Sequence, residues 1–365
     1  MPNSSPRPVA QILIILFFLA SLAATGIAWW TTAKAEENRL RENFFLDSNA
    51  AHRWLADRLL NYSYLFGSIR AFVENSETVT RVEWQDYSQR AQITNLYPGL
   101  RSIVYAPRVK RRELTKFVNQ VKKANSDEPA YADYSLKLID PDFPENQTKT
   151  DFFPVLYTEG ANRTERLTAL GYDVSSEKER ASAVFTARDS DAFAATPPIR
   201  FVIQPINNGF GIILPIYQKG LPKDTLADLR QAFSGIIYAP FDINQFFDAI
   251  LKPNGQDAFP NLDLEVYDFQ SEDYLYDKDQ SISLLRDNNR YAITAKQTLS
   301  FANRRWEIYT GLPKEAVANP YRSATSLTIL ISGLIASLAT FFYLQKQLQP
   351  RKKNTSSSSH PTNMV

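Results

Sequence analysis

Two long apolar segments without a charged residue constrain this chain more than any other feature. They run from Val9 to Trp30 and from Ser323 to Leu344. A helix of about 20 apolar residues spans the hydrocarbon core of a bilayer. We therefore predict transmembrane helices at residues 9–30 and 323–344. A buried core helix is the alternative for each segment, and a cleaved signal peptide is a further alternative for the first.

Basic residues near the two segments indicate an orientation, because lysine and arginine favour the cytoplasmic side of a membrane. The tail after the second segment is basic, whereas the first segment has basic residues on both sides. Two spans place both termini on one side. We therefore predict a plasma (inner) membrane protein with cytoplasmic termini and with residues 31–322 in the periplasm or outside the cell. The basic residues are Arg7, Lys34, Arg39, Arg41, Lys346, Arg351, Lys352 and Lys353.

Composition excludes several classes of function. The formal net charge is only +2, which argues against a nucleic-acid-binding protein. The chain has no cysteine and two histidines, His52 and His360, so we expect neither a thiol nucleophile, a histidine triad nor a zinc site. Phosphate-binding glycine motifs are also missing from the sequence. We predict no enzyme activity, no cofactor and no metal site.

The segment after the first apolar stretch has the pattern of a long amphipathic helix. Apolar side chains recur at steps of mostly three or four residues, the spacing of one helix face. We predict a stalk helix within residues 31–80. Its apolar face either packs on its own domain or forms the seam of a homodimer. The apolar positions are Leu40, Phe44, Ala51, Leu55, Leu59, Tyr62, Phe66, Ile69 and Val73.

The region beyond the stalk alternates short helices and strands, which indicates an α+β fold. Thr80 with Glu83 forms a capping-box pattern at the start of a second helix. Pro98-Gly99 then turns the chain into a strand, "LRSIVYA". The segment "IRFVIQPINNGFGIILPIY" reads as a hairpin around an Asn-Asn-Gly turn. Other expected strands are "YSLKLID", "DFFPVLYTEG", "LDLEVYDFQ", "YAITAKQTLSF" and "RRWEIYTGLP", and further helices are expected in "KRRELTKFVNQVKKAN", "SSEKERASAVFTARDSD", "LPKDTLADLRQAF" and the end of "SGIIYAPFDINQFFDAIL".

Six blocks of sequence resemble, in the same order, blocks of the CHASE domain, an extracytoplasmic sensor of bacterial histidine kinases and diguanylate cyclases and of plant cytokinin receptors. They are "YPGLRSIVYAPRV", "DFFPVLYTEG", "TALGYDVSSEKERASAVFTARDSD", "AATPPIRFVIQP", "GFGIILPIY" and "SGIIYAPFDI". The resemblance covers about residues 81–240. It implies a long stalk helix followed by two PAS-like subdomains, with a small-molecule ligand in the membrane-distal one.

The resemblance also implies a set of pocket residues. Cytokinin receptors use a threonine at the start of a pocket strand, where this chain has Thr196, and Phe201 and Val202 follow on that strand. Their purine-binding acidic residue corresponds to Arg180. An arginine only donates hydrogen bonds, so Arg180 disfavours cytokinin and, if it points inward, favours an anionic ligand; the alternative is a solvent-facing helix residue. Tyr105, Tyr157 and Arg200 are further candidates, each of which is otherwise a core or surface residue.

The predicted function is a membrane-anchored sensor that binds a small molecule and passes a conformational signal across the membrane. The tail at 345–365 is shorter than any kinase or cyclase module, so we expect a cytoplasmic signalling partner or a longer receptor to read the signal. The alternative is a structural or assembly membrane protein that keeps a sensor-like fold without a ligand. The predicted divisions are a cytoplasmic end at 1–8, the first span at 9–30, the stalk at 31–80, a membrane-distal PAS-like subdomain at 81–235, a membrane-proximal one at 236–322, the second span at 323–344 and a disordered cytoplasmic tail at 345–365.

Overall fold

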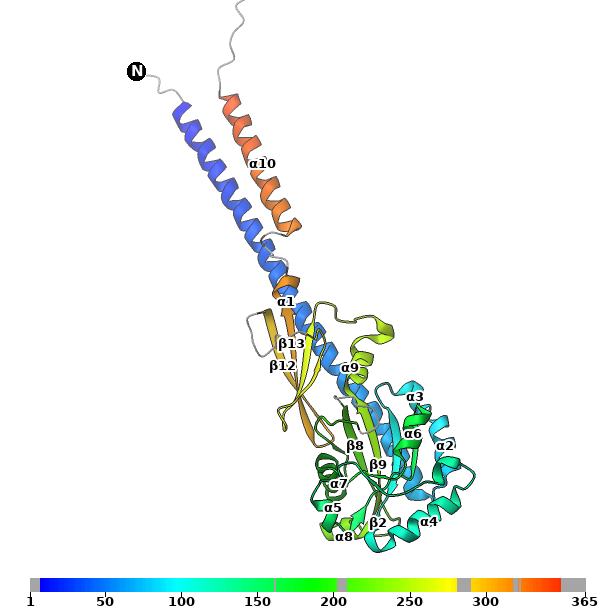
Figure 1. The fold of residues 1–365 in the computed structure, drawn as a ribbon. Coiled ribbons are helices and arrows are strands. Elements are labelled where there is room, and N and C mark those ends of the chain that lie inside the picture. Colours follow the sequence, from blue (N-terminus) through cyan, green and yellow to red (C-terminus); the bar gives the residue numbers. More distant parts are fainter. Residues whose placement is uncertain are drawn as a thin grey trace, which may run out of the picture. The chain divides into compact units, whose positions relative to one another are not determined.

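The computed structural model describes residues 7–160, 162–201, 209–280, 290–317, 321 and 323–348. It has the predicted mixture of helices and strands, with a long N-terminal helix and a C-terminal apolar helix (Figure 1). The helices are α1 (Arg7–Asn75), α2 (Arg81–Arg90), α3 (Ile93–Leu96), α4 (Leu114–Ala124), α5 (Glu145–Thr148), α6 (Arg163–Ala169), α7 (Lys178–Ser190), α8 (Leu226–Ala232), α9 (Ile243–Leu251) and α10 (Ala324–Gln347).

The strands form two main antiparallel sheets. The first has five strands in the order β5-β1-β9-β8-β7, and the second has four in the order β11-β10-β13-β12. The first sheet consists of β1 (Ser102–Pro107), β5 (Tyr157–Gly160), β7 (Ala194–Ala195), β8 (Gly209–Tyr217) and β9 (Phe233–Asp242). The second consists of β10 (Asp263–Asp268), β11 (Tyr274–Asp277), β12 (Tyr291–Phe301) and β13 (Arg304–Pro313). Two-residue pairs join β2 (Val109–Lys110) to β4 (Asp151–Phe152) and β3 (Lys137–Leu138) to β6 (Tyr172–Asp173).

The chain divides into two compact units. One unit consists of residues 1–43 and 315–365 and contains the two apolar helical segments. Within it α1 and α10 pack closely, since the ring centroids of Phe18 and Phe341 lie 4.8 Å apart. A β-carbon on Gly333 would lie 2.4 Å from Thr25 Cγ2, so the absent side chain permits this approach. Both apolar helices are long enough to span a membrane, and only 6% of each apolar window is buried, which excludes the buried core helix as an alternative.

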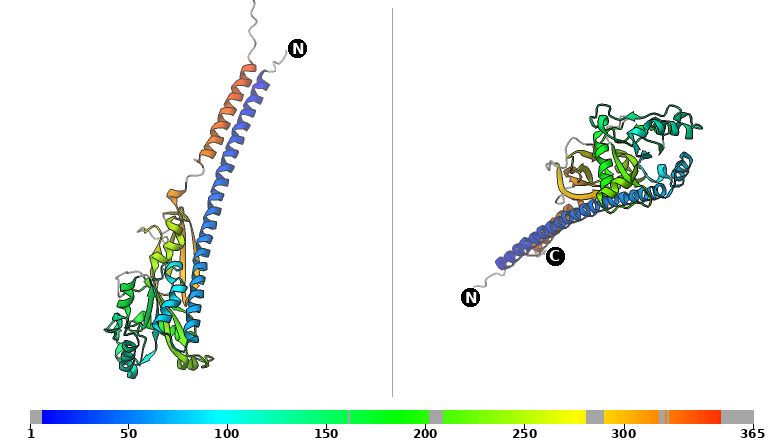
Figure 2. Two further views of the ribbon diagram at one scale, coloured as in Figure 1. Left: turned by 90° about the vertical axis from the view of Figure 1, so that its right-hand side faces the viewer. Right: turned by 90° about the horizontal axis from the view of Figure 1, so that it is seen from below.

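The second unit, residues 44–314, contains both sheets and the rest of α1. The four-stranded sheet packs along the earlier part of this α1 segment, where Ser48 and Thr310 side chains lie 2.8 Å apart. The five-stranded sheet packs along the later part, where the ring of Tyr62 lies edge-on to that of Phe241 at 5.0 Å. Figure 1 and the left view of Figure 2 show the two sheets one after the other along the helix.

The predicted apolar face of the stalk packs on its own domain. From Phe44 to Val73 every predicted position on that face is at most 6% exposed in the single chain. Of the two alternatives, packing on its own domain and a homodimer seam, the structure shows the first for this face. Large apolar side chains also lie on other sides of α1 and are exposed, among them Leu46 at 64%, Leu60 at 51% and Tyr64 at 67%.

Several predicted elements differ in extent from those in the structure. The division predicted between residues 235 and 236 falls inside β9, which pairs with β1 and β8, so this strand belongs to the first sheet. The "YSLKLID" strand is reduced to the two residues of β3. The next residue, Ile139, donates its amide to the Ser176 hydroxyl instead of to a neighbouring strand. The second arm of the predicted hairpin is β8, while its turn and most of its first arm lie outside the described residues.

Candidate ligand-binding site

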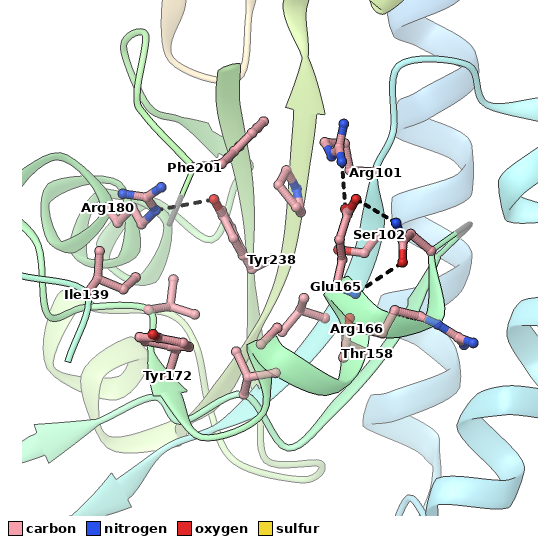
Figure 3. A pocket seen from close by; sticks show the side chains of 16 residues that line it. Arg101, Ser102, Ile139, Thr158, Glu165, Arg166, Tyr172, Arg180, Phe201 and Tyr238 are labelled. Carbon is pink, nitrogen blue, oxygen red and sulfur yellow. Dashed lines mark hydrogen bonds and ion pairs between the residues drawn. The ribbon is translucent and has the colours of Figure 1, made fainter. Parts of the chain in front are cut away.

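A cavity of about 110 Å³ lies on one face of the five-stranded sheet, between that sheet and α6, β6 and α7 (Figure 3). Its walls are mostly apolar: Val104, Ile139, Val155, Ala169, Tyr172, Val174, Phe201, Tyr238 and Pro240. The polar groups in its lining are Arg101, Ser102, Thr158, Asn162, Glu165, Arg166 and Arg180. A concave, largely apolar site with a few convergent polar groups is the usual form of a small-molecule pocket.

The alternation of side chains along the strands decides which residues reach the cavity. In β1, Ser102 and Val104 line it, and in β9, Tyr238 and Pro240 do so. Successive side chains of a strand point to opposite faces, so the intervening residues point away. Tyr105 accordingly packs against the ring of Trp84 at 5.9 Å, on the other face of the sheet.

Two glycines of β8 make room for aromatic rings of the cavity wall. A β-carbon on Gly209 would lie 2.3 Å from the ring of Phe201, and one on Gly211 would lie 2.4 Å from the ring of Tyr238. Both glycines lie on the same face of the strand, because they are two residues apart. Any side chain at either position would displace a ring that lines the cavity.

Arg180 is the buried charged group of the cavity, with 4% of its surface exposed. Its Nε donates to the Tyr238 hydroxyl at 3.3 Å, its Nη1 to the Glu177 carboxylate at 2.9 Å and its Nη2 to a backbone carbonyl at 2.8 Å. Glu177 also caps α7 by accepting from two backbone amides. Burial lowers the pKa of the guanidinium, but Tyr238 and Glu177 outweigh that effect and raise it above its ordinary value. Arg180 therefore stays charged.

The other charged groups of the lining are paired as well. Arg101 donates to Glu165 of α6 at 2.6 Å, and Arg166 of the same helix is bonded to Glu159. In Figure 3 the guanidinium of Arg166 points away from Arg180 and Tyr238. The cavity therefore presents apolar walls with its charges neutralised at the edges, rather than a strongly charged surface.

Comparison with known proteins identifies the family. A family model of the CHASE domain matches residues 77–276, more than half of the chain. The chain belongs to the CHASE domain family. The matched region takes in the cavity and both of its walls, together with the first part of the second sheet. The two apolar helices lie on either side of this CHASE sensor domain in the sequence, as in a two-span membrane protein.

The structure of the CHASE protein is similar to the crystal structure of the periplasmic sensory domain of the Campylobacter jejuni chemoreceptor Tlp1. The TM-score is 0.41 at 10% identity, with 78% of this chain and 97% of that chain covered. That score is too low for the likeness to support an inference about fold or ligand. Among curated proteins, none matches the sequence.

The predicted pocket residues of the CHASE domain occupy different environments. Arg180 and Phe201 both line the cavity, so the solvent-facing alternative for Arg180 does not hold. Thr196 is 3% exposed, but its hydroxyl accepts from the Gly211 amide at 2.9 Å and so holds β7 against β8. Tyr105 and Tyr157 lie on the opposite face of the sheet.

Arg200 and Val202 are the two remaining residues that the sequence predicted for the pocket. Arg200 contributes its backbone carbonyl, which accepts from the Arg180 guanidinium at 2.8 Å; it is not among the residues that line the cavity. Val202 lies outside the described residues.

Sequence reasoning missed most of the cavity wall. Tyr238 belongs to the block "SGIIYAPFDI", and strand alternation with a known inward position would have placed it beside Pro240. Ala169 ends the short helix α6, Tyr172 belongs to the two-residue strand β6 and Ile139 follows the two-residue strand β3. Elements this short show no period from which a side-chain direction could be predicted. These residues reach the cavity only because the segment before α7 folds back over the sheet.

The fold also brings three carboxylates within 4.8 Å of one another, at Asp263 of β10, Asp277 of β11 and Asp279 just after β11. The Tyr291 hydroxyl donates to Asp263, and Arg290 pairs with Asp279 at 3.4 Å. Burial, followed by Asp279, raises the pKa of Asp277 to about 6. These protein partners account for the cluster, and we assign no metal to it.

Proposed function

We propose that this CHASE protein is an extracytoplasmic sensor that binds a small molecule in the cavity over the five-stranded sheet. The observation that carries the proposal is Arg180, a buried, charged side chain that lines a mostly apolar cavity. Replacing a buried ion pair by apolar side chains of similar volume is often neutral or stabilising, so stability alone does not require a charged group at this position.

The chemistry of the cavity favours a small, largely apolar ligand with one hydrogen-bond acceptor. A guanidinium carries five N–H donors, and three of those of Arg180 are used within the described residues. The remaining donors on Nη1 and Nη2 fit a carbonyl or a carboxylate. Because arginine has no acceptor, the site disfavours the purine ring of a cytokinin.

The two sheets correspond to the two PAS-like subdomains that the family implies. In this interpretation the five-stranded sheet is the membrane-distal, ligand-binding subdomain, and the four-stranded sheet is the membrane-proximal one. β9 joins the first subdomain, so the division between the two falls after this strand.

The signal passes through the two ends of the second unit. Tyr62 of α1 touches Phe241, which lies on β9 three residues after the cavity residue Tyr238. At the other end, β13 leads into the segment that precedes α10. A ligand that binds one arrangement of the cavity more tightly shifts the population of that arrangement, and α1 and β13 carry the shift to the two membrane-crossing helices. A cytoplasmic partner, or a further part of a longer receptor, then reads it.

The membrane orientation and the oligomeric state belong to the same proposal. Both termini lie in the cytoplasm, because the tail that follows α10 is basic.

The chain forms a homodimer through α1, where Leu46, Leu60 and Tyr64 stay exposed after the helix has packed on its own domain. Charge on this surface, for example Leu60→Glu, is expected to convert the dimer into a monomer in analytical ultracentrifugation, and circular dichroism is expected to show that the monomer remains folded.

A thermal-shift screen of the full chain in detergent tests ligand binding. Neutral carbonyl compounds and carboxylates of increasing size are compared, and a compound at 100 times its Kd is expected to add about 2.7 kcal/mol to the free energy of unfolding. In Arg180→Gln the affinity for that compound falls roughly tenfold or more, since about 1.4 kcal/mol corresponds to a factor of ten. Arg112→Gln, at a side chain that is 76% exposed, serves as the matched control and leaves the affinity unchanged. If no compound stabilises the protein, the structural alternative is favoured.

A further inference from the structure

A second pocket lies on the opposite face of the edge strand β5, between that strand, α2 and α6. It has a volume of about 90 Å³ and is distinct from the cavity described above, although Thr158 and Arg166 line both. One bound water needs about 10–15 Å³ of such space, so this pocket is large enough for a small organic molecule.

Unpaired polar atoms are concentrated around this pocket. Within the described part of the chain, seven buried side-chain nitrogen or oxygen atoms lack a hydrogen-bond partner, and four of them belong to residues that line it. They are Trp84 Nε1, Arg81 Nε, Arg166 Nε and Thr158 Oγ1. Trp84 is 1% exposed and Thr158 is 8% exposed, so bulk water does not solvate these atoms. A buried donor without a partner is destabilising, so a ligand that accepts hydrogen bonds from these atoms would gain the energy of pairing them.

The chemistry of the unpaired atoms selects the kind of ligand. Three of the four are N–H groups that only donate, and the fourth is a hydroxyl that also donates. The acidic groups of the lining are already engaged, because Glu128 accepts from Arg163 at 3.2 Å and Glu159 accepts from Arg166. The Nη2 of Arg81 is likewise bonded to Asp127. What the site lacks is therefore an acceptor, and not a cation or a donor.

We propose that this pocket binds a small carboxylate whose oxygens accept from Trp84 Nε1 and from the Nε atoms of Arg81 and Arg166. Hydrogen bonds from guanidinium to carboxylate are charge-assisted and stronger than neutral ones. The indole N–H supplies a third, uncharged donor. This site does not depend on the first cavity being a ligand site, because Trp84 and Arg81, two of its three donors, do not line that cavity.

Fluorine NMR of the full chain, labelled with 5-fluorotryptophan and held in lipid nanodiscs, tests the proposal. The chain has five tryptophans, and Trp84→Phe assigns the Trp84 resonance. Sodium acetate is titrated against sodium chloride at equal ionic strength. We expect a saturable shift of the Trp84 resonance with acetate and none with chloride. No saturable shift up to about 100 mM acetate, which corresponds to binding weaker than about 1.4 kcal/mol, would overturn the proposal. So would an equal shift with chloride.

Two variants separate this site from the first cavity. Arg81→Lys keeps the charge that pairs with Asp127 but removes the Nε donor, and it is expected to weaken acetate binding roughly tenfold, or about 1.4 kcal/mol. Arg180→Gln removes the charged group of the first cavity and is expected to leave the acetate titration of Trp84 unchanged. Retained affinity in Arg81→Lys contradicts the assignment, as does loss of the acetate shift in Arg180→Gln. Trp54→Phe, which removes a partly exposed indole, is the control for the loss of one fluorinated tryptophan.

Discussion

The two faces of the five-stranded sheet differ in how tightly they are packed. On the face toward α1, Phe241 stacks on Phe210 at 5.0 Å and meets Tyr62 edge-on at the same distance. On the other face, Gly211 leaves room for the Tyr238 ring, and Ser102 and Tyr238 both line the cavity. One face is thus filled to join the sheet to the stalk, and the other is kept open. Because strand side chains alternate, both properties come from the same few strands.

The largest expected effect concerns the filled face. Phe241→Ala removes a ring that is 0% exposed and has four aromatic neighbours, so a cavity is left in the core. We expect the free energy of unfolding to fall by about 3–5 kcal/mol. Chemical denaturation of the full chain in detergent measures this, with Phe185→Ala, at a side chain that is 37% exposed, as the control. A loss as small as that of the control contradicts a rigid connection between sheet and stalk.

The next effect concerns the open face. Gly211→Ala places a β-carbon against the Tyr238 ring, which moves the ring and separates its hydroxyl from Arg180. We expect a loss of about 1–3 kcal/mol of stability from overpacking. Ligand binding in the thermal-shift assay is expected to fall more steeply than stability does. Unchanged binding would show that the space beside Gly211 is not part of the ligand site.

A smaller effect is expected for Tyr238→Phe. The change keeps the ring but removes the hydroxyl that accepts from Arg180 Nε. Loss of one hydrogen bond of this kind costs about 1 kcal/mol. Urea denaturation measures the stability, and comparison of binding in this variant with that in Gly211→Ala separates the position of the ring from its hydrogen bond. If Tyr238→Phe destabilises the protein as much as Phe241→Ala, the two faces are not as different as proposed.

The smallest expected effect is a gain in stability. It tests whether a glycine is required only where a β-carbon would meet another residue. Gly67 lies on α1 with no atom within 4 Å of the position that a β-carbon would take. Gly67→Ala is therefore expected to stabilise the protein by about 0.5–1 kcal/mol, because glycine weakens a helix interior. The unfolding midpoint in denaturant measures this gain. A loss of stability here would remove the contrast with Gly211.

The repeating parts of the fold could be predicted from the sequence. The spacing of apolar residues predicted the stalk and its buried face, which is confirmed from Phe44 to Val73. The predicted capping box at Thr80 and Glu83 is also confirmed, with both of its hydrogen bonds formed. Local patterns of this kind can be predicted because they depend on residues within one helical turn of each other.

The cavity could not be predicted in the same way. Arg180 was a candidate through the family resemblance, but neither its burial nor its bond to Tyr238 follows from any local pattern. The two residues are 58 positions apart and meet only through the packing of α7 on the sheet. Thr196 was expected in the pocket and instead bonds the Gly211 amide, because a backbone donor at the sheet edge lay within its reach.

By itself, the sequence determined the two apolar helices, the amphipathic stalk and the family, since these depend on periods and motifs written along the chain. Only the tertiary structure decided which side chains share a cavity, which donors remain unpaired around Trp84, and where β9 belongs. The physical reason is that burial and pairing arise between residues far apart in the chain, and no local period encodes which of them meet.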